Sequence, residues 1–303
     1  MSEPKSTPGG RWFAVMQYLL PQILLSRLVG AIARSRLGWV RRPLIAAFMR
    51  GFKPDMRDAV QPDPQGYGSF NLFFTRALRP QTRPASPASD AIDSPVDGTI
   101  SALGQCSSGR LIQAKGRDYG LRELLAGHDT LADSLAGGEF MTIYLAPFNY
   151  HRIHMALAGS LREAWYVPGR LFSVNDTTAR YVPNLFARNE RVVLHFDGPR
   201  GPHVLVMVGA LFVGSMGTVW HGDIAPRRAR GAIPLPVPPG APVAASATLA
   251  RGAELGRFNM GSTVILLLPP GKARWDASLA SGSVLRMGEQ IGSVRAAASG
   301  NPL

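Results

Sequence analysis

The stretch ELGRFNMGSTVILLL, residues 254–268, passes from a polar segment through Gly261-Ser262-Thr263 into five aliphatic residues at 264–268. A short apolar run of this kind, entered through a turn, is typical of a buried strand. Glycine or proline closes several similar runs, at residues 140–146, 191–196 and 204–213. The sequence therefore predicts an α+β fold with a β-rich body of antiparallel strands.

The composition supports a folded chain with a large core. Hydrophobic residues make up 46% of the 303 residues and charged residues only 17%, which excludes a disordered protein. The single cysteine, Cys106, cannot form an intrachain disulfide, in keeping with a reducing compartment.

The positive charge is concentrated at the N-terminus. Residues 1–60 contain ten Lys and Arg against three Asp and Glu, more than half of the chain's net charge of +13. Such a segment attracts anionic lipid or nucleic acid. Here arginine alternates with aliphatic residues and no zinc-finger or ribonucleoprotein signature occurs, so we predict no nucleic-acid partner. We predict instead a membrane-associating segment at 1–60 that precedes a β-rich domain at 61–303.

Two amphipathic helices are expected in this segment. The apolar stretch at 12–33 is interrupted by Gln17, Pro21, Gln22 and Arg27, so no clean run of about 20 apolar residues remains to span a membrane. One helix face carries apolar residues at the i, i+3, i+4, i+7 spacing, namely Leu25, Leu28, Val29 and Ile32. A second helix is expected to begin near Pro43 and to carry Leu44, Ile45, Phe48 and Phe52.

Apolar faces flanked by arginine suit the lipid–water interface. The alternative is that these faces pack on the protein's own core, because periodicity does not distinguish protein from lipid. No clear export signal is present, so we expect a peripheral protein on the cytoplasmic face of the cell membrane.

Three segments contain residue types that carry chemistry. Residues 94–99 place Asp97 in a tight turn, residues 150–155 place His151 and His154 three apart, and Ser262 follows Gly261. Each has an ordinary structural explanation when taken alone. Together they supply the Asp, His and Ser that activate a hydroxyl group, as in a serine hydrolase. Ser262 does not lie in the G-x-S-x-G sequence of one hydrolase class, and no ligand set for a metal is evident.

The ordered motifs resemble one known family. The chain is similar to the bacterial, membrane-associated type of phosphatidylserine decarboxylase from about residue 20 to residue 287. The resemblance is carried by residues 70–76, 111–116, 150–154, 167–175, 183–191 and 254–263. Motifs of this length in this order make coincidence a poor explanation.

The resemblance implies a self-processing proenzyme. The Ser262 hydroxyl would attack the Gly261 carbonyl, with His154 as general base and Asp97 orienting it. Cleavage would leave a beta chain, 1–261, and an alpha chain, 262–303, that begins with a pyruvoyl group made from Ser262. The two chains would remain together as a heterodimer, which would itself dimerise.

The resemblance further implies decarboxylation of phosphatidylserine to phosphatidylethanolamine, with the pyruvoyl group as covalent cofactor. His151 is the expected proton donor to the substrate Cα, with Tyr150 as the alternative. The substrate pocket is expected to include Ser173, Phe70, Phe73 and Phe74. Two alternatives remain open. One is a serine hydrolase that uses Asp97, His154 and Ser262 without cutting its own chain, and the other is a non-catalytic, membrane-binding protein in which residues 261–263 form only a turn.

The sequence departs from the family pattern beside the histidines. Asn149 stands where the family more often has an acidic residue, and Ala156 where it more often has proline. Loss of a carboxylate beside His151 is expected to lower the pKa of this histidine.

Overall fold

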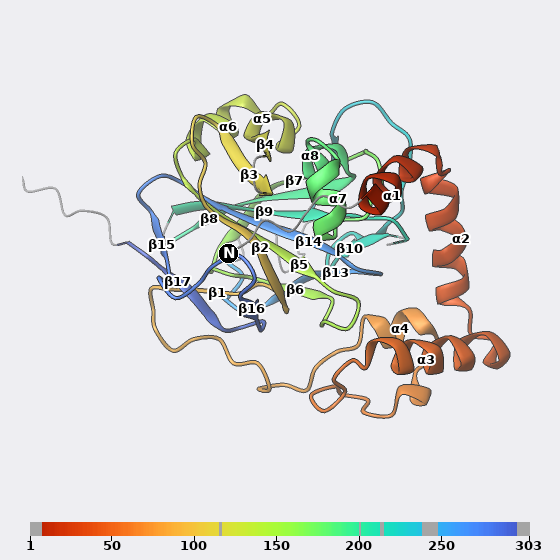
Figure 1. Ribbon diagram of the computed structural model, residues 1–303. Helices are drawn as coiled ribbons and strands as arrows, with labels where there is room; N and C mark the ends of the chain where they lie inside the picture. The colour runs from red at the N-terminus through yellow and green to blue at the C-terminus, as the bar shows by residue number, and fades with distance from the viewer. Residues whose placement is uncertain (1–7, 115–116, 200, 213–214, 238–247, 296–303) are drawn as a thin grey trace, which may run out of the picture.

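The computed structural model describes residues 8–114, 117–199, 201–212, 215–237 and 248–295. The last two residues of the motif at 111–116 therefore lie outside the described residues. So do the first seven residues of the predicted beta chain and the last eight of the predicted alpha chain. Figure 1 shows an arm of N-terminal helices along one side of a β-rich body. The α+β prediction is confirmed: helices and antiparallel sheets are both present, and the sheets dominate.

The central sheet is built around residues 262–268, in which an aliphatic run follows Ser262 and Thr263. Strand β14 (Ser262–Leu268) is buried along its whole length and pairs antiparallel with β5 (Glu139–Leu145) and β9 (Gly201–Val208). The remaining strands of this eight-stranded sheet are β12 (Ile233–Pro234), β7 (Ser160–Val167), β8 (Arg191–Gly198), β2 (Gly98–Gln105) and β16 (Val284–Leu285).

A second sheet feeds the chain into β14. It has the order β11 (Gly222–Ile224), β10 (Met216–Thr218), β13 (Glu254–Phe258) and β6 (Arg152–His154). The chain leaves β13 and enters β14 after residues 259–261, so the Gly261–Ser262 bond lies where it passes between the two sheets. Smaller sheets contain β1 (Ala91–Asp93), β17 (Gln290–Val294) and β15 (Ala273–Trp275), and β3 (Arg110–Ala114) with β4 (Arg117–Gly120).

The N-terminal arm contains α1 (Pro8–Leu19), α2 (Gln22–Arg34) and α3 (Gly38–Phe52). A 3₁₀ turn, η1 (Pro64–Gly66), and α4 (Phe70–Phe74) follow it. Short helices in the body are α5 (Leu121–Leu124), α6 (Asp129–Leu135), α7 (Asp176–Tyr181) and α8 (Leu185–Arg188). No single described helix is long and apolar enough to cross a membrane; α1 and α2 together meet that test but are bent by 89° at the break between them.

Two boundaries differ from those expected. Helix α3 begins at Gly38, five residues before Pro43, so the proline lies inside the helix and not in its first turn. The strand expected at 204–213 ends earlier, at Val208, although the Gly209 N–H still donates to the carbonyl of Glu190. Residue 213 lies outside the described residues.

Helix α2 packs on its small and polar side. Its buried residues are Gln22, Ser26, Gly30 and Ala33, whereas Leu24 and Leu28 are 67% and 56% exposed. Ala33 joins Ile45 of α3 and the buried phenylalanines of α4 in a core cluster separate from that of the sheets. The arm is thus fixed to α4 by an aromatic cluster, while much of its apolar surface faces outward. The division at residue 60 remains a prediction.

The buried side chains at the centre of β14 are expected to contribute strongly to the free energy of unfolding. Replacing Ile265, which has no exposed surface, with alanine is expected to lower the free energy of unfolding by about 2–5 kcal/mol, from lost burial and the cavity left behind. The same change at Val284, 73% exposed, is expected to have little effect. Urea unfolding of both variants measures this, and an equal loss in both would contradict the arrangement of the core.

Candidate active site

The Gly261–Ser262 bond is buried at the first residue of β14. Ser262 lies opposite Leu145 of β5 and has no exposed surface. Its Oγ is buried and has no hydrogen-bond partner. A Cβ atom placed on Gly261 would lie 3.4 Å from the Leu145 carbonyl oxygen and 3.9 Å from His151 Nε2. Gly261 therefore lies in contact range of a histidine ring, directly before the unpaired hydroxyl.

His151 presents an unprotonated nitrogen toward this bond. Its Nδ1 lies 2.8 Å from the Asn149 carbonyl oxygen, which can only accept, so Nδ1 carries the proton and Nε2 keeps its lone pair. Nε2 is buried without a hydrogen-bond partner, and the ring packs against Phe74 with centroids 4.0 Å apart. Burial, with a smaller contribution from Arg76, lowers the pKa of His151 to about 3.

The lowered pKa has the direction expected from the sequence, but its main cause is burial. Arg76 holds the turn before the histidine: one of its Nη atoms donates to the carbonyls of Phe148 and Asn149, at 3.2 and 3.4 Å. The Arg76 side chain is buried, and this burial lowers the pKa of its guanidinium. A buried cation therefore positions the carbonyl that orients His151.

His154 is held in the corresponding tautomer. Its Nδ1 lies 2.8 Å from the Gly252 carbonyl oxygen, so it carries the proton, and Nε2 accepts from the Tyr150 hydroxyl at 2.9 Å. Burial lowers the pKa of His154 and raises that of Tyr150. Both groups are therefore neutral near pH 7, and His154 Nε2 is able to take a proton through the Tyr150 hydroxyl.

Asp97 lies near His154 without bonding to it. The backbone N–H of His154 donates to the Pro95 carbonyl, which brings the two segments together. Asp97 Oδ1 accepts from the Met287 N–H at 2.7 Å, and Oδ2 is 3.7 Å from Arg83. Burial raises the pKa of Asp97, and its negative charge in turn favours protonated His154. Asp97 thus acts on His154 through its charge and not through a hydrogen bond. The histidine next to Gly261 is His151.

A network not expected from the sequence holds the segment before the bond. Asn71 of α4 donates to the carbonyl and the side-chain oxygen of Asn259, each at 3.2 Å. The Asn259 amide donates to Ser215 Oγ, which also accepts from Arg34 of α2 at 2.6 Å. The one signal in the sequence was a lone asparagine within an aromatic run. Its partner, Asn259, is 188 residues away along the chain, so local sequence could not identify the pair.

An apolar cavity opens beside the same bond. It has a volume of about 440 Å³ and is lined by Gly261, by residues of α2 and α3, and by Phe70, Phe74 and Ser173. Of the other residues expected in a pocket, Phe73 is fully buried in the aromatic cluster and Tyr150 bonds to His154. Within the described part of the chain, no group of three His, Cys, Asp or Glu residues could hold a metal ion.

Comparison with known proteins assigns the chain to a family. A family model described as phosphatidylserine decarboxylase matches residues 70–293, and a second, described as PSD, matches residues 12–53. The chain belongs to the phosphatidylserine decarboxylase family. The resemblance seen in the sequence is confirmed, and the serine-hydrolase alternative is not favoured.

The curated relatives match this family member over nearly their full length. The phosphatidylserine decarboxylase proenzyme of Pseudomonas fluorescens (strain Pf-5) is 49% identical over 93% of this chain and 97% of its own. The proenzymes of Pseudomonas entomophila and Pseudomonas aeruginosa (strain LESB58) are each 50% identical, over 93% and 92% of this chain and 97% and 96% of their own. Their shared name, proenzyme, describes a chain that is processed.

The lowered pKa of His151 predicts a specific acid sensitivity. In the unfolded chain this histidine binds a proton below about pH 6.5, while in the folded chain it stays neutral down to about pH 3. Its contribution to stability is therefore full above pH 6.5 and is lost as the pH falls. Between pH 6 and 4, we expect His151→Gln to reduce the pH slope of the unfolding free energy by about 1.4 kcal/mol per pH unit. Urea unfolding across this range measures it, and identical slopes would contradict a neutral buried His151.

Proposed function

We propose that this chain decarboxylates phosphatidylserine to phosphatidylethanolamine after converting its own Ser262 into a pyruvoyl group. The observation that carries the proposal is the position of the Gly261–Ser262 bond. It is buried beside a neutral histidine and borders an apolar cavity. A residue released as a new N-terminus here would meet a lipid headgroup whose acyl chains extend between the N-terminal helices.

The self-cleavage chemistry follows from the free hydroxyl. Ser262 Oγ attacks the Gly261 carbonyl carbon, and the peptide C–N bond breaks as the C–O bond of an ester forms. Loss of the Ser262 α-proton with expulsion of the Gly261 carboxylate leaves dehydroalanine. Its imine tautomer takes up water and releases ammonia, which gives the pyruvoyl terminus. Because attack is intramolecular, positioning supplies much of the acceleration.

We assign His154 as the general base, with Asp97 stabilising its protonated form. The tautomer of His154 supports this role, because Nε2 accepts from the Tyr150 hydroxyl and can receive a proton through it. The negative charge of Asp97 favours the imidazolium that then forms. Ser262 Oγ lacks a hydrogen-bond partner among the described residues. Converting Ser262 into a pyruvoyl group would therefore break no existing hydrogen bond.

The pyruvoyl group supplies an electron sink for the bond between the substrate Cα and its carboxylate. We assign to His151 the return of a proton to Cα, because its Nε2 lies next to Gly261. Burial, with a smaller contribution from Arg76, keeps this histidine neutral. The carboxylate and phosphate of a bound substrate would raise its pKa and load it with the proton that it delivers.

The two cleaved chains would stay associated through the central sheet. Strand β14 begins at the cut and pairs on one side with β5 and on the other with β9, both from the larger chain. The exposed apolar side chains of the arm, beside its arginines, support peripheral binding to anionic membrane lipid on the cytoplasmic face. Pairing of two such heterodimers belongs to the same proposal.

The activity is tested with vesicles that contain phosphatidylserine labelled in the serine carboxyl group. The wild-type chain is expected to release labelled CO₂ and form phosphatidylethanolamine. Ser262→Ala, which removes the reacting oxygen, is expected to release none above background. Ser278→Ala, at an exposed serine of the same predicted alpha chain, serves as the matched control and should keep full activity. Release by the Ser262→Ala variant would contradict the proposal.

The two histidine roles are separable in the same variants. His154→Gln is expected to leave the chain uncut on denaturing gels. His151→Gln is expected to be cut but to lose about 100-fold or more in decarboxylation rate. If His151→Gln stays uncut while His154→Gln is processed, the assigned roles are exchanged and the mechanism above is wrong.

A further inference from the structure

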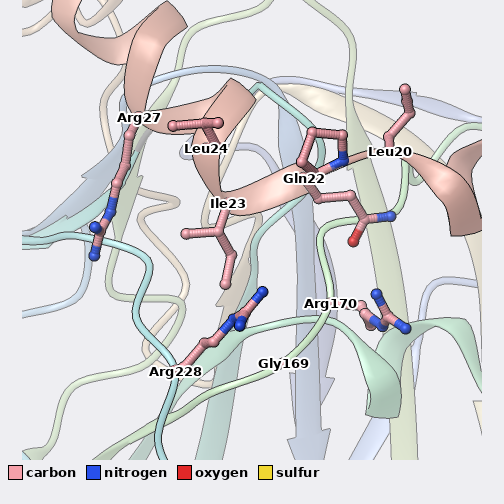
Figure 2. A pocket seen from close by; sticks show the side chains of 9 residues that line it. Leu20, Gln22, Ile23, Leu24, Arg27, Gly169, Arg170 and Arg228 are labelled. Atoms are coloured by element: carbon pink, nitrogen blue, oxygen red, sulfur yellow. The ribbon is translucent and has the colours of Figure 1, made fainter.

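A second cavity lies at the bend between α1 and α2. Its volume is about 680 Å³, and it is lined by one face of the first turns of α2 and by three arginines, Arg27, Arg170 and Arg228. Figure 2 shows these arginines arranged around Ile23 and Leu24. We call this site the arginine pocket. It shares no lining residue with the apolar cavity at Gly261.

The three guanidinium groups lack acidic partners. Within the residues that the structure describes, none of them lies within 4.0 Å of a carboxylate. No Asp or Glu lines the pocket. Three arginines that line one cavity without a counter-charge favour an anionic ligand, and arginine matches the geometry of a phosphate group.

The pocket is held in shape by contacts from three separate segments. Arg27 donates to the Pro226 carbonyl at 2.9 Å, which ties α2 to the segment that carries Arg228. Gln22, only 4% exposed, accepts from the Leu171 N–H at 2.9 Å and so fixes the start of α2 to the neighbour of Arg170. The backbone of Arg170 is held in turn by Arg188 and Glu190. The backbone that carries these arginines is therefore fixed before a phosphate binds, while the Arg170 and Arg228 side chains are exposed.

The surroundings of the pocket indicate a lipid as the source of that phosphate. Leu19 and Leu24, at the bend, are 75% and 67% exposed. Exposed apolar side chains continue along α2 at Leu28 and Ile32. A phosphate on the arginines would thus have an apolar surface beside it, on which acyl chains can lie. A soluble phosphate would leave this surface unused.

From these observations we propose that the arginine pocket binds the phosphate of an anionic phospholipid other than the substrate. The proposal rests on the proposed function for its membrane setting. Ile23 in the pocket and Ile32 at the Gly261 cavity are nine residues apart on α2, about 13 Å along the helix axis. A lipid bound at one end of α2 would fix the height of this helix in the membrane and hence that of the substrate cavity.

The test uses the full chain and monomeric dihexanoyl phosphatidylglycerol in titration calorimetry. We expect saturable binding of one lipid per chain, weakened about ten-fold or more by the double change Arg170→Gln and Arg228→Gln. Arg27 is left in place because it also holds the pocket. The matched control, Arg42→Gln with Arg50→Gln, removes the same charge from exposed positions of α3 and is expected to bind as the wild type does.

Equal weakening in both double variants would show attraction by net charge alone and overturn the proposal. Inorganic phosphate that binds as tightly as the lipid would overturn the lipid assignment. Competitive inhibition of decarboxylation of short-chain phosphatidylserine would place the lipid in the Gly261 cavity and also overturn it. A wild-type chain without decarboxylase activity would remove the proposed function, while the binding result would still decide the pocket.

Discussion

The backbone of β14 is fixed by its neighbours in the sheet, while the hydroxyl of its first residue has no hydrogen-bond partner among the described residues. From Thr263 to Leu267 the strand pairs on both sides, and Ser262 itself pairs with Leu145. A buried hydroxyl without a partner costs about 1–3 kcal/mol. The sheet supplies the stability that keeps this atom in place. Gly261, His151 and the apolar cavity lie next to this point, where a paired strand begins with an unpaired side chain.

The N-terminal arm is connected to this point by hydrogen bonds. Arg34 of α2 donates to Ser215, and Ser215 accepts from Asn259, three residues before Ser262. Asn71 of α4 bonds to the same asparagine. Because α2 also exposes its leucines, the helix that faces away from the protein contacts the network that holds the cleavage segment. The placement of the arm and the geometry of the bond are therefore physically coupled.

Much of this arrangement could be predicted from local sequence, but some parts could not. The aliphatic run after Ser262 identified the central strand, and the order of motifs identified the family. Amphipathic spacing predicted α2 and its apolar face. Only the structure shows that the helix instead buries the side that carries Ser26 and Gly30. The partners of His154, Tyr150 and Gly252, depend on backbone geometry that spacing does not encode. The arginine pocket combines segments nearly 150 residues apart, and no local pattern marks it.

The central claim is that Ser262 is both the nucleophile and the source of the cofactor. The intact mass of the purified, denatured protein tests it most directly. The account predicts two chains divided between Gly261 and Ser262, the smaller one with the mass of a pyruvoyl terminus in place of serine. A single full-length mass that persists after long incubation would contradict it.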